Sequence, residues 1–390
     1  MSEQRSQADH FRAYGPATRA IHAGYRPDPG TGAVNTPIYA SSTFAQDGVG
    51  GLRGGYEYAR TGNPTRAALE IQLAALEGGN FGRAFSSGMA ATDCALRAVL
   101  RPGDHLVIPD DAYGGTFRLI DKVFSNWGIT HTPAALADLD AVRAALTPRT
   151  RMIWVETPTN PMLSIADIAG IVQMAATSGM KVLVDNTFAS PALQQPLSLG
   201  ADIVLHSTTK YIGGHSDVVG GALVTNDEEL DTAFAFLQNG AGAVPGPFDV
   251  YLTYRGLKTL PLRMARHCEN AGRVAEFLAA HPKVDQVLYP GLPTHPNHDV
   301  ASRQMSGFGG MVSLRLKGGP EAVRQFCSRT EIFILAESLG GVESLIEYPG
   351  AMTHASTAGS QLEVPDDLAR LSVGIEDIAD LLGDLEQALS

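Results

Sequence analysis

Between about Pro64 and Gly256, short apolar runs alternate with longer stretches of helical periodicity. Each run has the length of a buried strand, and the stretches between runs have room for helices that cross over a sheet. The candidate strands occupy residues 105–109, 152–156, 181–185, 202–206 and 221–225. The candidate helices occupy residues 67–77, 89–100, 166–177 and 228–238. This alternation predicts a doubly wound α/β fold around a parallel sheet.

The segments on either side of this region have different patterns. Residues 1–60 are rich in Gly, Pro, Ser and Thr and predict an extended arm, which is stable only against another part of the structure or another subunit. After Gly256, helical stretches occupy residues 257–280, 322–328 and 375–389, and strand candidates occupy residues 284–288 and 310–316. We therefore expect an arm over residues 1–60 that contacts the neighbouring subunit, an α/β domain over 61–256 and a smaller α+β domain over 257–390.

The composition argues against several classes of protein. The net charge of -12 opposes the phosphate backbone of nucleic acids, and no basic stripe offsets it. The polar N-terminus does not resemble a secretory signal, and no run approaches the roughly 18 apolar residues that a membrane span needs. Cys94, Cys268 and Cys327 lie far apart, without the spacing of a metal or redox site. We expect a cytoplasmic protein with reduced, structural cysteines, no metal, no nucleic acid and no membrane partner.

Polar side chains follow two of the predicted strands. Asp185 ends the run at 181–185, and Lys210 follows the run at 202–206. Ligands of open α/β sheets bind beyond the carboxyl ends of the strands. A lone Asp there is usually a turn or cap residue, and a lone Lys is usually a solvated charge. Together they predict a pyridoxal-phosphate site, because this cofactor needs a lysine for its covalent bond and an acid for its pyridine nitrogen.

A helix start near residues 85–91 offers a cradle for the phosphate of such a cofactor. Ser87, Gly88 and Met89 form its centre, where unpaired N–H groups and the helix dipole favour an anion. A Ser-Gly pair is also a common helix cap, so this signal alone is weak. Ser207 and Thr209 add hydroxyl groups just before the lysine, although they could equally form a turn. No GxxxxGK[ST] or GxGxxG motif supports an ATP or NAD site.

These residues lie within ordered motifs that resemble the pyridoxal-phosphate enzymes of cysteine and methionine metabolism nearly from end to end. The motifs are TRAIHAG at 18–24, YEYARTGNPT at 56–65, YGGT at 113–116, ETPTNP at 156–161, HSTTKYIGGHS at 206–216, LAESLGG at 335–341, MTHA at 352–355 and RLSVGIED at 370–377. The resemblance implies the aspartate aminotransferase-like fold (fold type I), with a large, mostly parallel sheet in the cofactor-binding domain and a smaller α+β domain after it.

The resemblance also assigns roles to residues around the cofactor. It implies that Lys210 binds pyridoxal 5'-phosphate covalently and later moves protons between substrate carbons, while Asp185 pairs with the pyridine nitrogen. Tyr113 would stack over the cofactor ring and take part in proton transfer. Tyr58 and Arg60 match a Tyr-x-Arg pair that reaches the phosphate in a neighbouring subunit, a task that suits a guanidinium fork. This implies a homotetramer, a dimer of dimers with active sites shared between chains.

Further residues indicate the substrate and the reaction. The resemblance places Arg370 at the α-carboxylate of an amino-acid substrate, with Asn160 nearby. Glu337, followed by Ser338, matches the pattern in which a carboxylate faces the distal end of the substrate, which favours synthases and γ-lyases over β-lyases. Methionine γ-lyases typically carry Cys where this chain has Gly115.

Within the family, the sequence most resembles the bacterial cystathionine γ-synthases. In the expected reaction, L-cysteine replaces the acyloxy group at the γ-carbon of O-succinyl- or O-acetyl-L-homoserine, which gives L-cystathionine. Cystathionine γ-lyase, which releases cysteine, 2-oxobutyrate and ammonia, stays the alternative, because the two activities share their motifs. Another pyridoxal-phosphate chemistry or a non-catalytic binding protein is more remote, since Lys210, Asp185 and Arg370 are all present.

Overall fold

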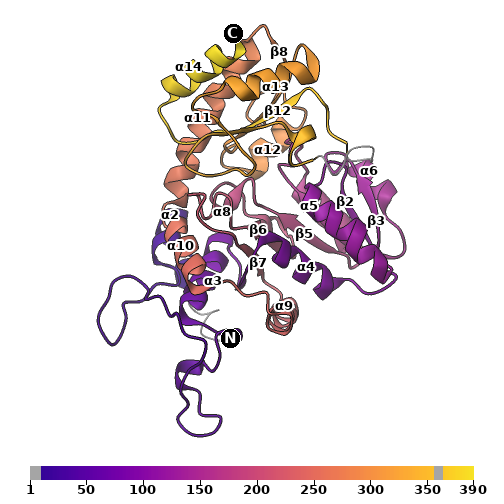
Figure 1. Cartoon of the computed structure of the whole chain (residues 1–390). Helices are drawn as coiled ribbons and strands as arrows, with labels where there is room; N and C mark the ends of the chain where they lie inside the picture. Colours follow the sequence, from indigo (N-terminus) through magenta and orange to yellow (C-terminus); the bar gives the residue numbers. More distant parts are fainter. Residues whose placement is uncertain (1–9, 355–362) are drawn as a thin grey trace. The chain divides into compact units, whose positions relative to one another are not determined.

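The structure is a computed structural model of the 390-residue chain that describes residues 10–354 and 363–390. The chain forms two compact units, each made from two stretches of sequence (Figure 1). The first unit comprises Met1–Ala98 and Asp202–Pro261, and the second comprises Val99–Ala201 and Leu262–Ser390. The predicted domain limits at residues 60 and 256 stay a prediction. The first nine residues of the predicted arm lie outside the described part.

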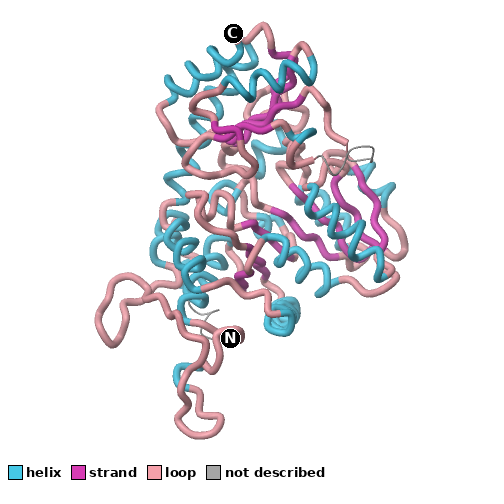
Figure 2. The backbone as a smooth tube through the Cα atoms, viewed as in Figure 1, coloured by secondary structure: helices cyan, strands magenta, loops and turns pink. Residues whose placement is uncertain are grey.

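The N-terminal segment of the first unit contains little regular structure. Helix α2 (Pro16–His22) is followed by a long loop with isolated bridges, Thr43 to Tyr58 and Gln46 to Leu52 (Figure 2). Helix α3 (Pro64–Glu77) then begins where the Asn63 side chain accepts hydrogen bonds from the N–H groups of Thr65 and Arg66, at 2.9 and 3.3 Å. This cap and the proline at the first position start the helix before the predicted residue 67.

Three antiparallel strands form the sheet of the first unit. Their order is β1 (Phe81–Phe85), β7 (Gly221–Thr225) and β6 (Ile203–Ser207). The remaining helices are α4 (Gly88–Val99), α9 (Glu228–Ala241) and α10 (Pro247–Leu257). The expectation that 221–225 is a parallel strand is wrong, since β7 runs against both neighbours. A parallel connection from β6 would need a crossover, usually helical, and the segment between these strands contains no helix.

Four parallel strands form the first sheet of the second unit. Their order is β5 (Lys181–Asp185), β4 (Thr150–Glu156), β2 (His105–Pro109) and β3 (Thr130–Ala134) (Figure 1). The flanking helices are α5 (Gly114–Arg118), α6 (Leu139–Ala145), α7 (Ile168–Ala176) and α8 (Ser190–Leu193). In the register of β4 and β5, Glu156 lies opposite Asp185. The predicted parallel α/β pattern is therefore present, and it ends in two adjacent carboxylates.

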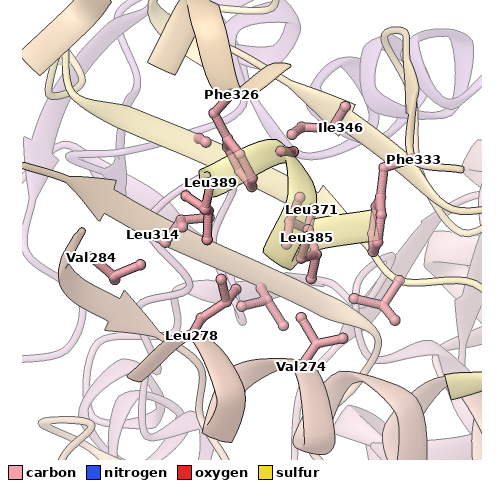
Figure 3. Packing of buried hydrophobic residues seen from close by; sticks show 14 of the residues in the cluster. Val274, Leu278, Val284, Leu314, Phe326, Phe333, Ile346, Leu371, Leu385 and Leu389 are labelled. Carbon is pink, nitrogen blue, oxygen red and sulfur yellow. The ribbon is translucent and has the colours of Figure 1, made fainter. Parts of the chain in front are cut away.

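The C-terminal part of the second unit is an α+β layer. Its strand order is β10 (Ile334–Leu335), β11 (Leu345–Glu347), β12 (Leu368–Ser372), β9 (Met311–Leu316) and β8 (Val284–Leu288). Its helices are α11 (Leu260–Ala280), α12 (His298–Gln304), α13 (Gly319–Arg329) and α14 (Ile378–Leu389). Side chains of α11, α13 and α14, including Val274, Phe326 and Leu385, share one buried cluster with Leu314 and Leu371 of the sheet (Figure 3). This core fixes β11 and β12, which carry Glu347 and Arg370.

Two further observations concern expectations about the chain. All three cysteines are free, and burial raises the pKa of the Cys94 and Cys327 thiols to about 12, which makes them unreactive. Within residues 10–354 and 363–390, no helix combines the length and hydropathy that crossing a membrane requires.

Candidate active site

Lys210 lies in a tight turn directly after β6. Its N–H donates to the Ser207 carbonyl at 3.2 Å, and its own carbonyl accepts the N–H of Gly214 at 2.8 Å. The Thr209 hydroxyl donates to the Gly220 carbonyl at 3.2 Å and accepts the Gly220 N–H at 3.1 Å. The turn is therefore fastened to the start of β7. The half-buried lysine is held at the carboxyl end of a strand, as the sequence predicts.

The predicted phosphate cradle lies beside this turn. Ser87 caps α4, because its hydroxyl accepts the Ala90 N–H at 3.0 Å. A Cβ on Gly88 would lie 3.0 Å from the Cβ and 3.1 Å from the Oγ of Ser207. A Cβ on Gly221 would lie 2.2 Å from the Ser87 carbonyl oxygen. A Cβ would collide with the backbone at Gly221 and would be crowded at Gly88, so the two glycines allow Ser87 and Gly88 to lie close to Ser207 and Gly221. Ser87, Gly88 and Met89 thus lie at the start of a 12-residue helix. Its first N–H groups suit a phosphate.

Tyr58 and Arg60 line a pocket of the first unit that is separate from the phosphate cradle. A pocket of about 630 Å³ is lined by these two residues together with Asn63, Arg66 and Phe248, among others. The Arg60 guanidinium carbon lies 5.5 Å from the centroid of the Tyr58 ring. Buried Arg66 donates to the carbonyls of Ala59, Arg60 and Thr61 at 3.0 to 3.1 Å and so holds the backbone of this segment. Sequence reasoning missed Arg66, which is the third residue of α3.

Three carboxylates gather at the strand ends of the second unit. Asp185 accepts the Thr187 N–H at 3.1 Å and faces Glu156 across the sheet. Burial, and then the charge of Asp185, raise the pKa of Glu156 well above its usual range. Burial also raises the pKa of Asp111 to about 6, although the hydroxyls of Thr159 and Ser164 donate to it. This concentration of negative charge suits a cationic group such as a protonated pyridine nitrogen.

Arg370 lies at the centre of a second group in this unit. Its Nη1 donates to Asn160 Oδ1 at 2.7 Å and lies 2.9 Å from Glu347 Oε1, and its Nη2 donates to the Ser338 carbonyl at 2.7 Å. Only 2 % of Arg370 is exposed. Ser338 has a φ of 93°, which is rare for a residue with a side chain. The guanidinium is therefore oriented from several sides, as a carboxylate-binding arginine must be.

Tyr113 caps the short helix α5 beside these groups. Burial is the main cause that raises the pKa of Tyr113. The charges of Arg118 and Arg370 lower this pKa by smaller amounts, and those of Glu156 and Glu337 raise it. The charges of Arg370 and of the exposed Glu337 therefore act on the pKa of the Tyr113 hydroxyl. Within the second unit, the structure brings the predicted residues Tyr113, Asn160, Asp185, Glu337, Ser338 and Arg370 into one neighbourhood.

Sequence reasoning missed several residues of this neighbourhood. Glu156 ends the run 152–156 in the way that Asp185 ends its own run, so the same strand-end argument could have found it. Glu347 lies on a strand of three residues, and no pattern in the sequence marked it as a site residue. The ring Nε2 of His354 donates to the Asn160 carbonyl at 3.1 Å, and burial and the Arg370 charge lower the pKa of His354 to about 4. It lies in the MTHA motif, which indicated the family but no role.

Comparisons with known proteins agree with this chemistry. The family model of the Cys/Met metabolism PLP-dependent enzymes matches residues 17–390. Cystathionine gamma-synthase of Mycobacterium tuberculosis is 79% identical over 389 residues, which cover 100% of both chains. The structure of metB from Corynebacterium glutamicum has a TM-score of 0.96 and 61% identity, covering 96% of this chain and 98% of that one.

A further solved structure carries ligands. Cystathionine gamma synthase of Xanthomonas oryzae pv. oryzae, in complex with aminoacrylate and cysteine, has a TM-score of 0.94 and 48% identity, covering 96% of this chain and 98% of that one. The fold class and the family resemblance predicted from the motifs are confirmed, and so is the dependence on pyridoxal phosphate. The chain belongs to the Cys/Met metabolism PLP-dependent enzymes.

Proposed function

We propose that the protein is a cystathionine γ-synthase, in which the sulfur of L-cysteine replaces the acyloxy group at the γ-carbon of an O-acyl-L-homoserine and the acyl group leaves as its carboxylic acid. The observation that carries this proposal is the 79% identity, over the full length of both chains, to a relative of that name. The Arg370 group supports an amino-acid substrate, since it presents an oriented guanidinium for an α-carboxylate. The acyl group, succinyl or acetyl, is the variable that the assay below tests.

The residues of the first unit fit the cofactor's aldehyde and phosphate ends. Lys210 would hold the cofactor covalently, and its amine could then move protons between the α- and β-carbons of the substrate. The N–H groups and hydroxyls of Ser87, Gly88, Met89, Ser207 and Thr209 bind the phosphate. When bound, pyridoxal phosphate supplies an electron sink for the negative charge that develops on the substrate carbons.

The residues of the second unit fit the ring and the substrate. Asp185, among its neighbouring carboxylates, would keep the pyridine nitrogen protonated. Tyr113 would cover the ring and could exchange a proton through its hydroxyl. Arg370 and Asn160 would bind the α-carboxylate, with the Ser338 carbonyl helping to orient Arg370. Glu337 would face the distal end, where an amino group of the product would be held.

Tyr58 and Arg60 support a shared active site. Both side chains are exposed in a single chain, at the edge of the 630 Å³ pocket. We propose that they reach the phosphate in a neighbouring subunit of a homotetramer. A cytoplasmic location stays a prediction.

The first experiment records the visible spectrum of the purified protein and assays O-succinyl- and O-acetyl-L-homoserine with and without L-cysteine. A yellow protein that forms cystathionine only when cysteine is present supports the proposal. Dominant release of 2-oxobutyrate from cystathionine would instead assign a γ-lyase. Lys210→Ala should remove the yellow colour, whereas Lys122→Ala should keep it, because Lys122 is a 74 % exposed lysine paired only with its neighbour Asp121.

A further inference from the structure

Glu156 joins two loops that carry proposed site residues. Its Oε2 accepts the Tyr113 N–H at 3.0 Å, and its Oε1 accepts the Asn160 N–H at 3.0 Å. One loop follows β2 and the other follows β4, so a single carboxylate ties the ends of two strands. We infer that Glu156 is a positioning residue, which sets the Tyr113 ring and the Asn160 amide for cofactor and substrate; the inference rests on the proposed function.

The location of Glu156 is unfavourable for a carboxylate unless its hydrogen bonds are kept. Only 4 % of the residue is exposed, and Asp185 lies opposite in the sheet register. Burying a charge beside another of the same sign is destabilising, and an apolar side chain would fill such a strand end without that penalty. What an apolar side chain lacks is an acceptor for two backbone N–H groups in two loops. The hydrogen bonds are therefore the property that a substitution would lose.

Asn160 transmits the position of Glu156 to Arg370. The backbone of Asn160 is held at both polar groups, its N–H by Glu156 and its carbonyl by the ring Nε2 of His354 at 3.1 Å. Its side-chain oxygen then accepts from Arg370 Nη1 at 2.7 Å. Loss of the Glu156 bond frees one end of this backbone. The amide would then lose its fixed orientation toward the guanidinium.

Two substitutions separate position from charge. Glu156→Gln keeps the shape but offers one acceptor in place of two, whereas Glu156→Asp keeps the charge but withdraws it by one methylene. A positioning role predicts that both variants raise KM for O-acyl-L-homoserine about tenfold, the size expected for one lost hydrogen bond to a charged group, with a smaller change in kcat. It also predicts that both weaken the visible circular dichroism of bound pyridoxal phosphate, which reports on the ring's fixed surroundings. Wild-type behaviour of Glu156→Asp would overturn the inference in favour of charge alone.

Asp384→Asn is a matched control for general loss of stability. Asp384 is also a buried carboxylate of the second unit, and it accepts the N–H groups of Glu331, Ile332 and Phe333 at 2.7 to 2.9 Å. The Asp384→Asn variant should lower the melting temperature, as Glu156→Gln does, but should leave KM and the visible circular dichroism unchanged. Equal effects of the two variants on KM and dichroism would reduce Glu156 to a purely structural role.

A double substitution tests the route through Asn160. If Glu156 acts on KM by holding Asn160, then Glu156→Gln combined with Asn160→Ala should raise KM no further than Asn160→Ala alone. Additive effects would contradict this route. The dichroism measurement needs only bound cofactor, so it still decides the role of Glu156 at Tyr113 if the protein proves to catalyse a different reaction of this family.

Discussion

The proposed phosphate-binding residues of the first unit and the proposed substrate-binding residues of the second unit are built on different principles. In the first unit, the glycine-packed cradle, formed by Ser87, Gly88, Ser207 and Gly221, relies on close approach of the backbone. In the second unit, the charged network of Asp111, Glu156, Asn160, Glu347 and Arg370 relies on buried hydrogen bonds and ion pairs. The first should therefore respond to added volume, and the second should respond to changes of charge and pH.

This difference follows from what each side must bind. A phosphate is recognised by N–H groups at a helix start, which need short distances more than side chains. An amino acid that changes its charge distribution during a reaction needs groups with a fixed orientation and a fixed charge. The following predictions test this difference, the first two each against a matched control variant.

The largest effect is expected for added volume in the cradle. In Gly221→Ala the new Cβ would lie 2.2 Å from the Ser87 carbonyl oxygen, so the start of α4 must move. We expect at least about 100-fold weaker binding of pyridoxal phosphate, corresponding to overpacking of about 3 kcal/mol, in a titration followed by absorbance. Gly240→Ala is the control, since nothing lies within 4 Å of its Cβ, and it should bind the cofactor normally. Unchanged affinity in Gly221→Ala would show that the cradle tolerates movement.

The second prediction concerns the buried ion pair between Arg370 and Glu347 and removes the charge of Glu347. Glu347→Gln should raise KM for the amino-acid substrate about tenfold or more, because the guanidinium loses its nearest charge, and should destabilise the protein by about 3 kcal/mol. Asp231→Asn is the control. Asp231 is also a buried carboxylate that pairs with an arginine, at 2.7 Å from the partly buried Arg83, but it lies in the first unit and outside the charged network. Denaturant unfolding should show similar losses of stability in Glu347→Gln and Asp231→Asn. Steady-state kinetics should show a raised KM in Glu347→Gln alone.

The sequence predicted the regular part of the fold well and its exceptions poorly. Strands β2, β5 and β7 span the predicted residues, because each is a continuous apolar run. Strand β1 was missed because Gly82 and Arg83 interrupt its pattern. Arg83 is accommodated there only by Asp231, 148 residues away, which no local window can detect. Strand β3 was missed because its polar residues lie at the edge of a sheet.

The site shows the same division. Lys210 and Asp185 were found because a strand-end argument and a family resemblance both led to them. The partners that orient them or their neighbours, such as Arg66 and Glu347, were not found, because their roles depend on contacts between distant segments. Glu156 is the intermediate case, since its place at a strand end was visible but the two backbone N–H groups that donate to it were not.

The third prediction concerns acid sensitivity of the second unit. Burial lowers the pKa of His267 and His354 to about 4, whereas an unfolded histidine titrates near 6.5. A lowered histidine pKa means that the stabilising contribution of the neutral ring is present above pH 6.5 and is lost as the pH falls toward 4. Each histidine should contribute up to about 3 kcal/mol to this loss. Denaturant unfolding between pH 7.5 and 4.5 should therefore be less pH-dependent in His354→Gln, and an unchanged slope would contradict the prediction.

The smallest effect has the opposite sign and concerns Asp111. Its pKa is raised to about 6 from an ordinary value near 3.8, so the carboxyl favours the folded state when it is protonated. Its contribution to stability is present below pH 3.8 and is lost as the pH rises through 6. Asp111→Asn should therefore stabilise the protein at pH 7.5 by about 1 kcal/mol, since the amide oxygen can still accept from the Thr159 or Ser164 hydroxyl. The gain should vanish near pH 4.5 in the same unfolding measurement. If catalytic activity falls while stability rises, the charge of Asp111 serves the reaction rather than the fold, as expected for the charged network and not for the glycine-packed cradle.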